Sequence, residues 1–178
     1  MATVISAYAP TLDAQDEVKE AFYADLDKTL SEVPKEDKLI LLGDFNARVG
    51  RNHHLWRGTL GREGVGNTNS NGILLLTKCS EHNLVITNTL FRQKTKFKTS
   101  WMHPRSKLWH LIDYVIVRSK DRRDVLNTRA MTSACRLQFL YSAIALTGRC
   151  DVGTGADRAA AAGPTLAADQ SILTLRTH

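Results

Sequence analysis

Cysteine is scarce in this sequence, and the spacing of the few present excludes two classes of small domain. Cys79, Cys135 and Cys150 are the three cysteines in 178 residues, and no two of them form a Cys-x-x-Cys pair. An odd number of widely spaced cysteines suits neither a disulfide framework nor a zinc site. We therefore expect reduced thiols in an intracellular protein, nuclear or cytoplasmic.

Long apolar runs and a secretory signal are also missing. No run approaches the roughly 20 residues that a membrane span requires. The first six residues do not place a basic stretch before an apolar core, so no secretory signal is predicted. A composition of 43% hydrophobic and 24% charged residues is typical of a folded soluble protein. We expect one domain with its own core, neither secreted nor bound to a membrane.

Positive charge, in contrast, is abundant and unevenly distributed. The net charge is +6, but residues 91–123 hold ten Lys or Arg and two acids, which gives that stretch +8. A local excess of this size suits a polyanionic partner. The alternative is a solvated loop or an edge strand protected by lysines. Charge alone leaves both interpretations open.

The N-terminal part of the sequence predicts a strand, a helix and a second strand. Residues 4–8 are β-prone, and Asp13 can cap a helix that runs to about Val33. The apolar stripe of this helix consists of Val18, Phe22, Leu26 and Leu30. Residues 39–42 are apolar without alternation, which indicates a strand covered on both faces.

Shorter elements are predicted up to about residue 131, and little order beyond it. The expected elements are a long loop over residues 48–72, a helix over 73–82, strands over 84–88, 99–102, 111–117 and 128–131, and a short helix near Arg122. The composition then becomes rich in Ala, Thr and Gly. We expect residues 132–178 to be an unrelated tail, disordered or weakly helical, with a short helix over 138–146.

The tetrapeptide Gly43-Asp44-Phe45-Asn46 follows the apolar strand and is the first candidate site. Ligands of α/β proteins commonly bind where strands end. Gly43 permits a tight turn, Asp44 offers a carboxylate, and Asn46 offers an amide that can donate and accept. Hard oxygens and an amide donor suit a Mg²⁺-dependent phosphoryl site. The alternative is an Asp-containing turn after a buried strand.

Asp113 is the second candidate, because a carboxylate inside an apolar strand is costly unless it is paired. It can orient a histidine, as carboxylates do in hydrolytic triads. The alternative is a partner for a backbone group or a salt bridge. His110 lies near this strand but is given no role.

The basic stretch contains aromatic residues, and this combination is the third candidate. Trp101 and Trp109 are interleaved with basic residues, namely Lys94, Lys96, Lys98, Arg105 and Lys107. Aromatic rings stack on bases while basic side chains neutralise phosphates. The alternative is a pair of core tryptophans beside a basic loop.

Five motifs occur in an order that resembles the endonuclease/exonuclease/phosphatase superfamily. They lie at residues 4–10, 39–46, 69–72, 99–101 and 112–114. The closest resemblance is to the endonuclease domain of non-LTR retrotransposons and to craniofacial development protein 2-like sequences, over about residues 2–131. It implies an α/β fold, a four-layer α/β sandwich, with Mg²⁺-dependent hydrolysis of a phosphodiester.

The resemblance also implies a role for each matching residue. Tyr8 would contact the scissile phosphate, and Asp44 would position or deprotonate the attacking water. Asn46 would stabilise charge on the phosphate, and Asp113 would orient the catalytic histidine. Ser100 would lie near the nucleic-acid backbone, beside Trp101.

Two parts of the family pattern are not found in this sequence. The family places a metal-binding Glu in a strand ahead of the Tyr-Ala-Pro motif, but only seven residues precede Tyr8. It ends on a Ser-Asp-His motif, yet the only histidine after His110 is His178. We therefore expect a partial sandwich that lacks the N-terminal strands and the usual C-terminal strand. A missing N-terminal segment, or the reverse transcriptase portion of a longer polyprotein, would complete it.

The sequence thus predicts an endonuclease domain acting on DNA, of retrotransposon-like source, truncated and at best very weakly active alone. Whether this chain is itself an enzyme stays open. A non-catalytic nucleic-acid-binding remnant is the alternative. A phosphatase of small or lipid phosphates is a third reading, which the basic, Trp-containing stretch disfavours.

Overall fold

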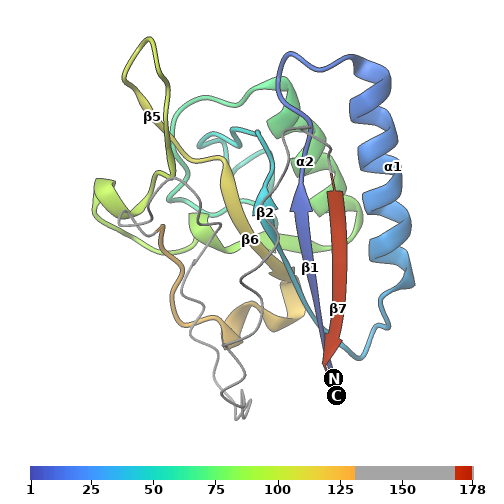
Figure 1. The fold of residues 1–178 in the computed structure, drawn as a ribbon. Helices are drawn as coiled ribbons and strands as arrows, with labels where there is room; N and C mark the ends of the chain where they lie inside the picture. The colour runs from blue at the N-terminus through green and yellow to red at the C-terminus, as the bar shows by residue number, and fades with distance from the viewer. Residues whose placement is uncertain (131–170, 178) are drawn as a thin grey trace, which may run out of the picture.

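A five-stranded sheet with two helices on one face forms the body of the protein (Figure 1). This computed structural model describes residues 1–130 and 171–177. The strand order is β3-β6-β2-β1-β7. The strands are β1 (Ala2–Tyr8), β2 (Lys38–Asp44), β3 (Leu84–Ile86), β6 (Asp113–Arg118) and β7 (Ser171–Thr177), and the helices are α1 (Asp16–Glu32) and α2 (Ser70–Glu81). The expected α/β class is confirmed.

Helix α1 forms where the apolar stripe predicts it. Phe22, Leu26 and Leu30 are buried against the sheet, whereas Val18 is exposed. Gln15 and not Asp13 occupies the N-cap position, and its side chain makes no capping hydrogen bond, so the predicted cap is wrong. A turn intervenes, in which the amide of Ala14 donates to the carbonyl of Thr11, and the helix begins after it.

Helix α2 begins three residues earlier than predicted, because Asn69 caps it. The Asn69 side chain accepts a hydrogen bond from the amide of Gly72 at 2.8 Å, which satisfies a free N–H of the first turn. Strand β3 is shorter than predicted, since Thr87–Thr89 form a 3-10 helix. The short helix expected near Arg122 is confirmed as the 3-10 helix Ser119–Asp124.

The two faces of the sheet are covered unequally. Alternate residues such as Ile5, Leu39 and Leu41 are buried against the helices. On the other face, Ile40 and Leu42 are only partly buried, so the prediction of a strand covered on both faces is wrong for β2. A second cluster of Val85, Val117 and Val125 covers that face at the β3–β6 end.

Strand β7 was not predicted, because its segment lies in the Ala- and Thr-rich tail. It pairs antiparallel with β1 along all seven residues. Arg176 Nε donates to Asp37 Oδ2 at 2.9 Å, and the hydroxyl of Thr3 donates to the same oxygen at 2.9 Å. The helix expected over 138–146 lies outside the described residues.

A small hairpin projects from one end of the sheet (Figure 1). It pairs β4 (Trp101–Met102) with β5 (Trp109–His110), so the predicted strand over 99–102 is confirmed in part and β5 was missed. The strand predicted over 128–131 is wrong for 128–130. Instead of pairing as a strand, the amide of Ala130 donates to the carbonyl of Phe97, at the end of the 3-10 helix Thr95–Phe97, at 2.8 Å. Within the described residues, no helix is long and apolar enough to cross a membrane.

Candidate active site

Three of the predicted catalytic residues lie side by side across three strands. Tyr8 at the end of β1 is in register with Asp44 at the end of β2, and Asp44 is in register with Asp113 at the start of β6. Register partners share one face of a sheet. Their strand neighbours Ala7 and Tyr114 are buried in the core on the helix side, so this row faces away from the helices.

The backbone around Asp44 places it against β1. A Cβ on Gly43 would lie 1.8 Å from the carbonyl oxygen of Ala7, so only glycine allows the two strands to approach this closely here. Phe45 is fully buried, and its amide donates to the carbonyl of Ile112 at 3.0 Å. The Gly-Asp-Phe-Asn sequence is therefore fixed to both neighbouring strands.

Asn46 closes a turn over the carboxylate of Asp44. Its backbone φ is +45°, a left-handed conformation that Asn tolerates better than most residues. Its amide N–H donates to Asp44 Oδ1 at 2.8 Å. Its side-chain Nδ2 donates to the carbonyl of Ala9 at 2.9 Å, one residue beyond Tyr8. Asn46 thus links the predicted Tyr8 and Asp44 positions.

Burial disfavours the charge of both carboxylates in the row, and the Asp113 carboxylate adds to this effect at Asp44. Burial, together with the nearby carboxylate of Asp113, raises the pKa of Asp44 to about 7, although the Asn46 amide opposes this shift. Burial also raises the pKa of Asp113, and its hydrogen bond with the Ser100 side chain opposes the rise. Two carboxylates held in this way favour a cation or a shared proton between them.

Two asparagines support this row, and sequence reasoning gave neither a role. Asn71 is 1% exposed, and its Nδ2 donates to the carbonyls of Pro10 and Asn46, at 3.1 and 3.2 Å. Asn88 accepts from the amide of Val115 at 2.8 Å and donates to the carbonyl of Asp113 at 3.4 Å. Asn71 lies in one of the five motifs, but nothing in its spacing indicates these bonds.

Ser100 joins the hairpin to Asp113. Its hydroxyl oxygen lies 3.3 Å from the amide of Ile112 and 3.4 Å from that of Asp113, and accepts from both. Its own amide donates to the carbonyl of His110 at 2.9 Å. The predicted nucleic-acid contact therefore lies at the base of the hairpin, within reach of the carboxylate row.

The hairpin exposes aromatic rings beside basic side chains. The ring of Trp101 stacks on His110 at a centroid distance of 5.9 Å and meets His103 edge-on at 5.4 Å. Trp101 is 39% exposed and Trp109 53%, so neither is a core tryptophan. Burial lowers the pKa of His110, and the charges of Arg48 and His103 add to this effect.

The predicted basic contacts differ in their availability. The side chains of Lys94, Lys96, Arg105 and Lys107 are exposed. The ammonium of Lys96 lies 5.0 Å from the centroid of the Phe97 ring. Lys98 is instead held in an ion pair with Glu63 at 2.6 Å, partly buried on both sides. Lys98 therefore ties the basic stretch to the long loop over residues 48–69.

Some parts of the predicted centre are not brought together by the described residues. No group of three or more His, Cys, Asp and Glu that could hold a metal ion is found among them. The hydrogen bond that bears on the Asp113 carboxylate comes from Ser100, and no histidine partner is recorded for it in this part of the chain.

Comparison with known families now identifies the chain. Residues 2–134 match the model of the family described as endonuclease-reverse transcriptase. The chain belongs to this family. The match starts within β1 and includes Tyr8, Asp44, Asn46 and Asp113, which confirms the resemblance on which their roles depend.

Individual proteins agree with this membership. The chain is 39% identical to craniofacial development protein 2 of Bos taurus over 132 residues, which cover 74% of this chain and 22% of that protein. The corresponding protein of Tragulus javanicus is 37% identical, with 74% and 23% covered. This chain thus spans about a fifth of the length of these curated relatives.

One solved structure shares the fold at low sequence identity, and a second is similar over a smaller part of the chain. A 3'-5' exonuclease, NExo, from Neisseria meningitidis is 20% identical, with a TM-score of 0.50 over 71% of this chain and 52% of that one. The endonuclease domain of TRAS1, a telomere-specific non-LTR retrotransposon, is 14% identical, with a TM-score of 0.43 over 62% and 43%. The architecture of the sheet and its helices is therefore that of an endonuclease/exonuclease/phosphatase-like fold.

Proposed function

We propose that this domain belongs to a machinery that hydrolyses DNA phosphodiester bonds with Mg²⁺, and that it derives from a retrotransposon-like source. The observation that carries the proposal is the row of Tyr8, Asp44 and Asp113 on one face of the sheet. It lies next to a hairpin that exposes tryptophan and basic side chains. The family, described as endonuclease-reverse transcriptase, and the fold shared with a 3'-5' exonuclease support the same class of reaction.

The residues of the row supply some of the oxygen ligands that a magnesium ion needs. Mg²⁺ is bound by hard oxygens, often one or two carboxylates together with water and substrate phosphate. Asp44 and Asp113 offer two such carboxylates in register, and their raised pKa values indicate that a cation between them would be favourable. When bound, the metal would neutralise charge on the phosphate and lower the pKa of a bound water.

Each residue has a role that its contacts permit. Asp44, with its pKa near 7, would position or deprotonate the attacking water. One N–H of the Asn46 side chain donates to Ala9, and the second would donate to a phosphate oxygen in the transition state. Tyr8, in register with Asp44, would contact the scissile phosphate. Asp113 would orient a histidine supplied from elsewhere.

The activity of this chain by itself is proposed to be very weak. The family's centre includes a metal-binding Glu and a histidine in a Ser-Asp-His motif. Residues 131–137 read Met-Thr-Ser-Ala-Cys-Arg-Leu at the expected position of that motif. Loss of one member of a catalytic unit lowers the rate by several orders of magnitude. A non-catalytic nucleic-acid-binding remnant, intracellular in location, is the second candidate, and the same missing histidine favours it.

The first test is plasmid nicking by the purified chain with and without Mg²⁺, next to an Asp44→Ala variant. We expect at most a trace of nicking, which requires Mg²⁺ and disappears in the variant. Robust nicking that Asp44→Ala abolishes would contradict the weak-activity proposal while supporting the assignment of Asp44. Nicking that survives in the variant would contradict the site itself. If the purified chain shows no salt-sensitive binding to DNA, the second candidate, a nucleic-acid-binding remnant, is ruled out.

A further inference from the structure

Strand β7 forms the outer edge of the sheet, and this edge lacks the features that usually protect one. Natural edge strands are blunted by prolines, bulges, inward-pointing charges or lysines. The sequence of β7, Ser-Ile-Leu-Thr-Leu-Arg-Thr, has no proline or glycine and a single charge, Arg176. Among the described residues, no strand pairs with its outer side.

The outward face of β7 is apolar and exposed. Leu173 is 66% exposed and Leu175 is 70% exposed, which are high values for leucine in a strand. Both lie on the face away from the helices, in register with Ser6 and Val4 of β1. Exposed neighbouring leucines on an open strand edge indicate an interaction surface.

We propose that β7 is a self-association edge. Two copies of the chain would pair antiparallel through their β7 strands about a two-fold axis at Thr174, so that one sheet runs through both. Such an arrangement places the same surface on both subunits, as two-fold interfaces require.

The sequence of β7 is complementary to itself in this register. With Thr174 opposite Thr174 of the second copy, Leu173 faces Leu175 of that copy, and Leu175 faces its Leu173. Four leucines then meet on one face of the joined sheet, where cross-strand apolar pairs stabilise a ladder. A register shifted by one residue would pair no leucine with leucine: Leu173 would face Thr174 or Arg176, and Leu175 would face Ile172 or Thr174.

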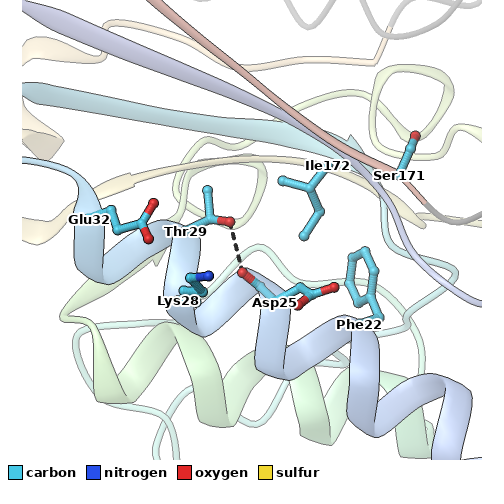
Figure 2. A pocket seen from close by; sticks show the side chains of 7 residues that line it. All are labelled: Phe22, Asp25, Lys28, Thr29, Glu32, Ser171 and Ile172. Atoms are coloured by element: carbon cyan, nitrogen blue, oxygen red, sulfur yellow. Dashed lines mark hydrogen bonds between the residues drawn. The ribbon is translucent and has the colours of Figure 1, made fainter.

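The charges on the helix side fit the same pairing. A groove of about 350 Å³ lies between α1 and β7, and Figure 2 shows Ile172 pointing from β7 toward the helix. Asp25, Lys28 and Glu32 of α1 line this groove, so two carboxylates and one ammonium face β7, a net charge of −1. In the proposed register, Ile172 faces Arg176 of the second copy, which brings a guanidinium to the end of the groove where Asp25 lies (Figure 2).

Arg176 is able to serve both copies. Its Nε is bonded to Asp37 of its own chain, but its side chain is still 49% exposed. A guanidinium has five N–H donors, so the bond to Asp37 leaves others for a second carboxylate. This charge complementarity favours a second copy over an unrelated apolar strand as the occupant of the edge.

The mass of the full chain in solution tests the proposal. Sedimentation equilibrium over a wide concentration range should show a reversible monomer–dimer transition. A Leu173→Lys/Leu175→Lys variant places four lysines at the two-fold axis, and should raise the dissociation constant at least about tenfold. Both leucines are exposed in the single chain, so its circular dichroism spectrum should be unchanged.

A matched control shows whether dimerisation responds to where the lysines are placed and not only to the added charge. Leu55 and Leu126 are 75% and 55% exposed and lie outside β7. A Leu55→Lys/Leu126→Lys variant adds the same two charges and should dimerise like the native chain. A native chain that stays monomeric, a β7 variant that still dimerises, or a control that also loses dimerisation would each overturn the proposal.

Disulfide trapping tests the register even if the lysine variant fails to fold. In a chain with Cys135→Ser and Cys150→Ser, a Thr174→Cys change puts two thiols opposite each other across the axis. Opposed residues in antiparallel strands are about 4.5–5.5 Å apart at Cα, within the range of a disulfide. Oxidation should give a covalent dimer with Thr174→Cys and little with Leu55→Cys. Equal cross-linking of the two variants would overturn the register.

Discussion

At the scale of single residues, the ionised carboxylate of Asp44 lowers the stability of the folded state. Asp44 has a folded pKa of about 7, against an ordinary value of 3.8, because it is buried beside Asp113. The folded state therefore binds more protons than the unfolded state between these pH values, and its stability declines as the pH rises from about 4 to 7. Natural proteins accept such a cost where a function requires it.

An Asp44→Asn variant should relieve this cost. We expect it to be more stable than the native chain near pH 8 by up to about 4 kcal/mol, with little gain near pH 4, where Asp44 is protonated in the folded state. Urea unfolding at the two pH values measures the difference. Asp13→Asn, an exposed change in a loop, is the control and should show no such dependence. Equal stability of Asp44→Asn and the native chain at high pH would contradict the assigned burial.

Asn71 is the second residue whose importance is visible only in three dimensions. It bonds the carbonyls of Pro10 and Asn46, which lie in two different motifs. An Asn71→Leu change leaves both carbonyls without this partner, and should lower the free energy of unfolding by about 2 kcal/mol. The exposed Asn67, changed to Leu, is the matched control. If the two variants unfold at the same urea concentration, Asn71 does not fix the site.

At the scale of elements, the hairpin β4–β5 is where the basic stretch meets the site. The sequence predicted β4 from its β-prone residues, but β5 has only two residues and follows a turn at Lys107, whose φ is +57°. No local pattern announces such a turn in a non-glycine residue. The exposure of Trp101 and Trp109 also could not be decided from sequence, because tryptophan is common in cores.

Removing charge from this hairpin should weaken DNA binding in a way that salt reveals. Arg105→Ala/Lys107→Ala should reduce the slope of log affinity against log salt by about 2, if each side chain neutralises one phosphate. Lys98→Ala should change the slope less, because Lys98 is already paired with Glu63. Fluorescence anisotropy with a DNA duplex measures both. A larger loss of slope in Lys98→Ala than in the hairpin variant would contradict this ranking.

At the scale of the whole molecule, the sequence predicted the parts with strong local patterns and missed the pairings between distant segments. The apolar stripe of α1 and the apolar run of β2 are each formed by residues close together in the sequence, so both could be predicted. The family resemblance gave Tyr8, Asp44 and Asp113 roles in one site, but their alignment depends on strand register, which is seen only in the structure. Strand β7 lies among Ala- and Thr-rich residues and forms because the edge of β1 accepts it, more than 160 residues away.

The pairing of β7 with β1 should determine how well the amides of β1 are protected from hydrogen exchange. Strand β7 covers one edge of β1 along its whole length, packs Ile172 against the core and bonds Asp37 through Arg176. A chain that stops after residue 170 loses all three contacts, so the β1 amides that face β7 should exchange with solvent much faster. Amides of α2, which lies outside the β1–β7 pair, should exchange as before in the native fold. Hydrogen exchange resolved by residue measures both sets. Unchanged protection of β1 would mean that β7 does not stabilise the sheet, and it would remove the strand on which self-association depends.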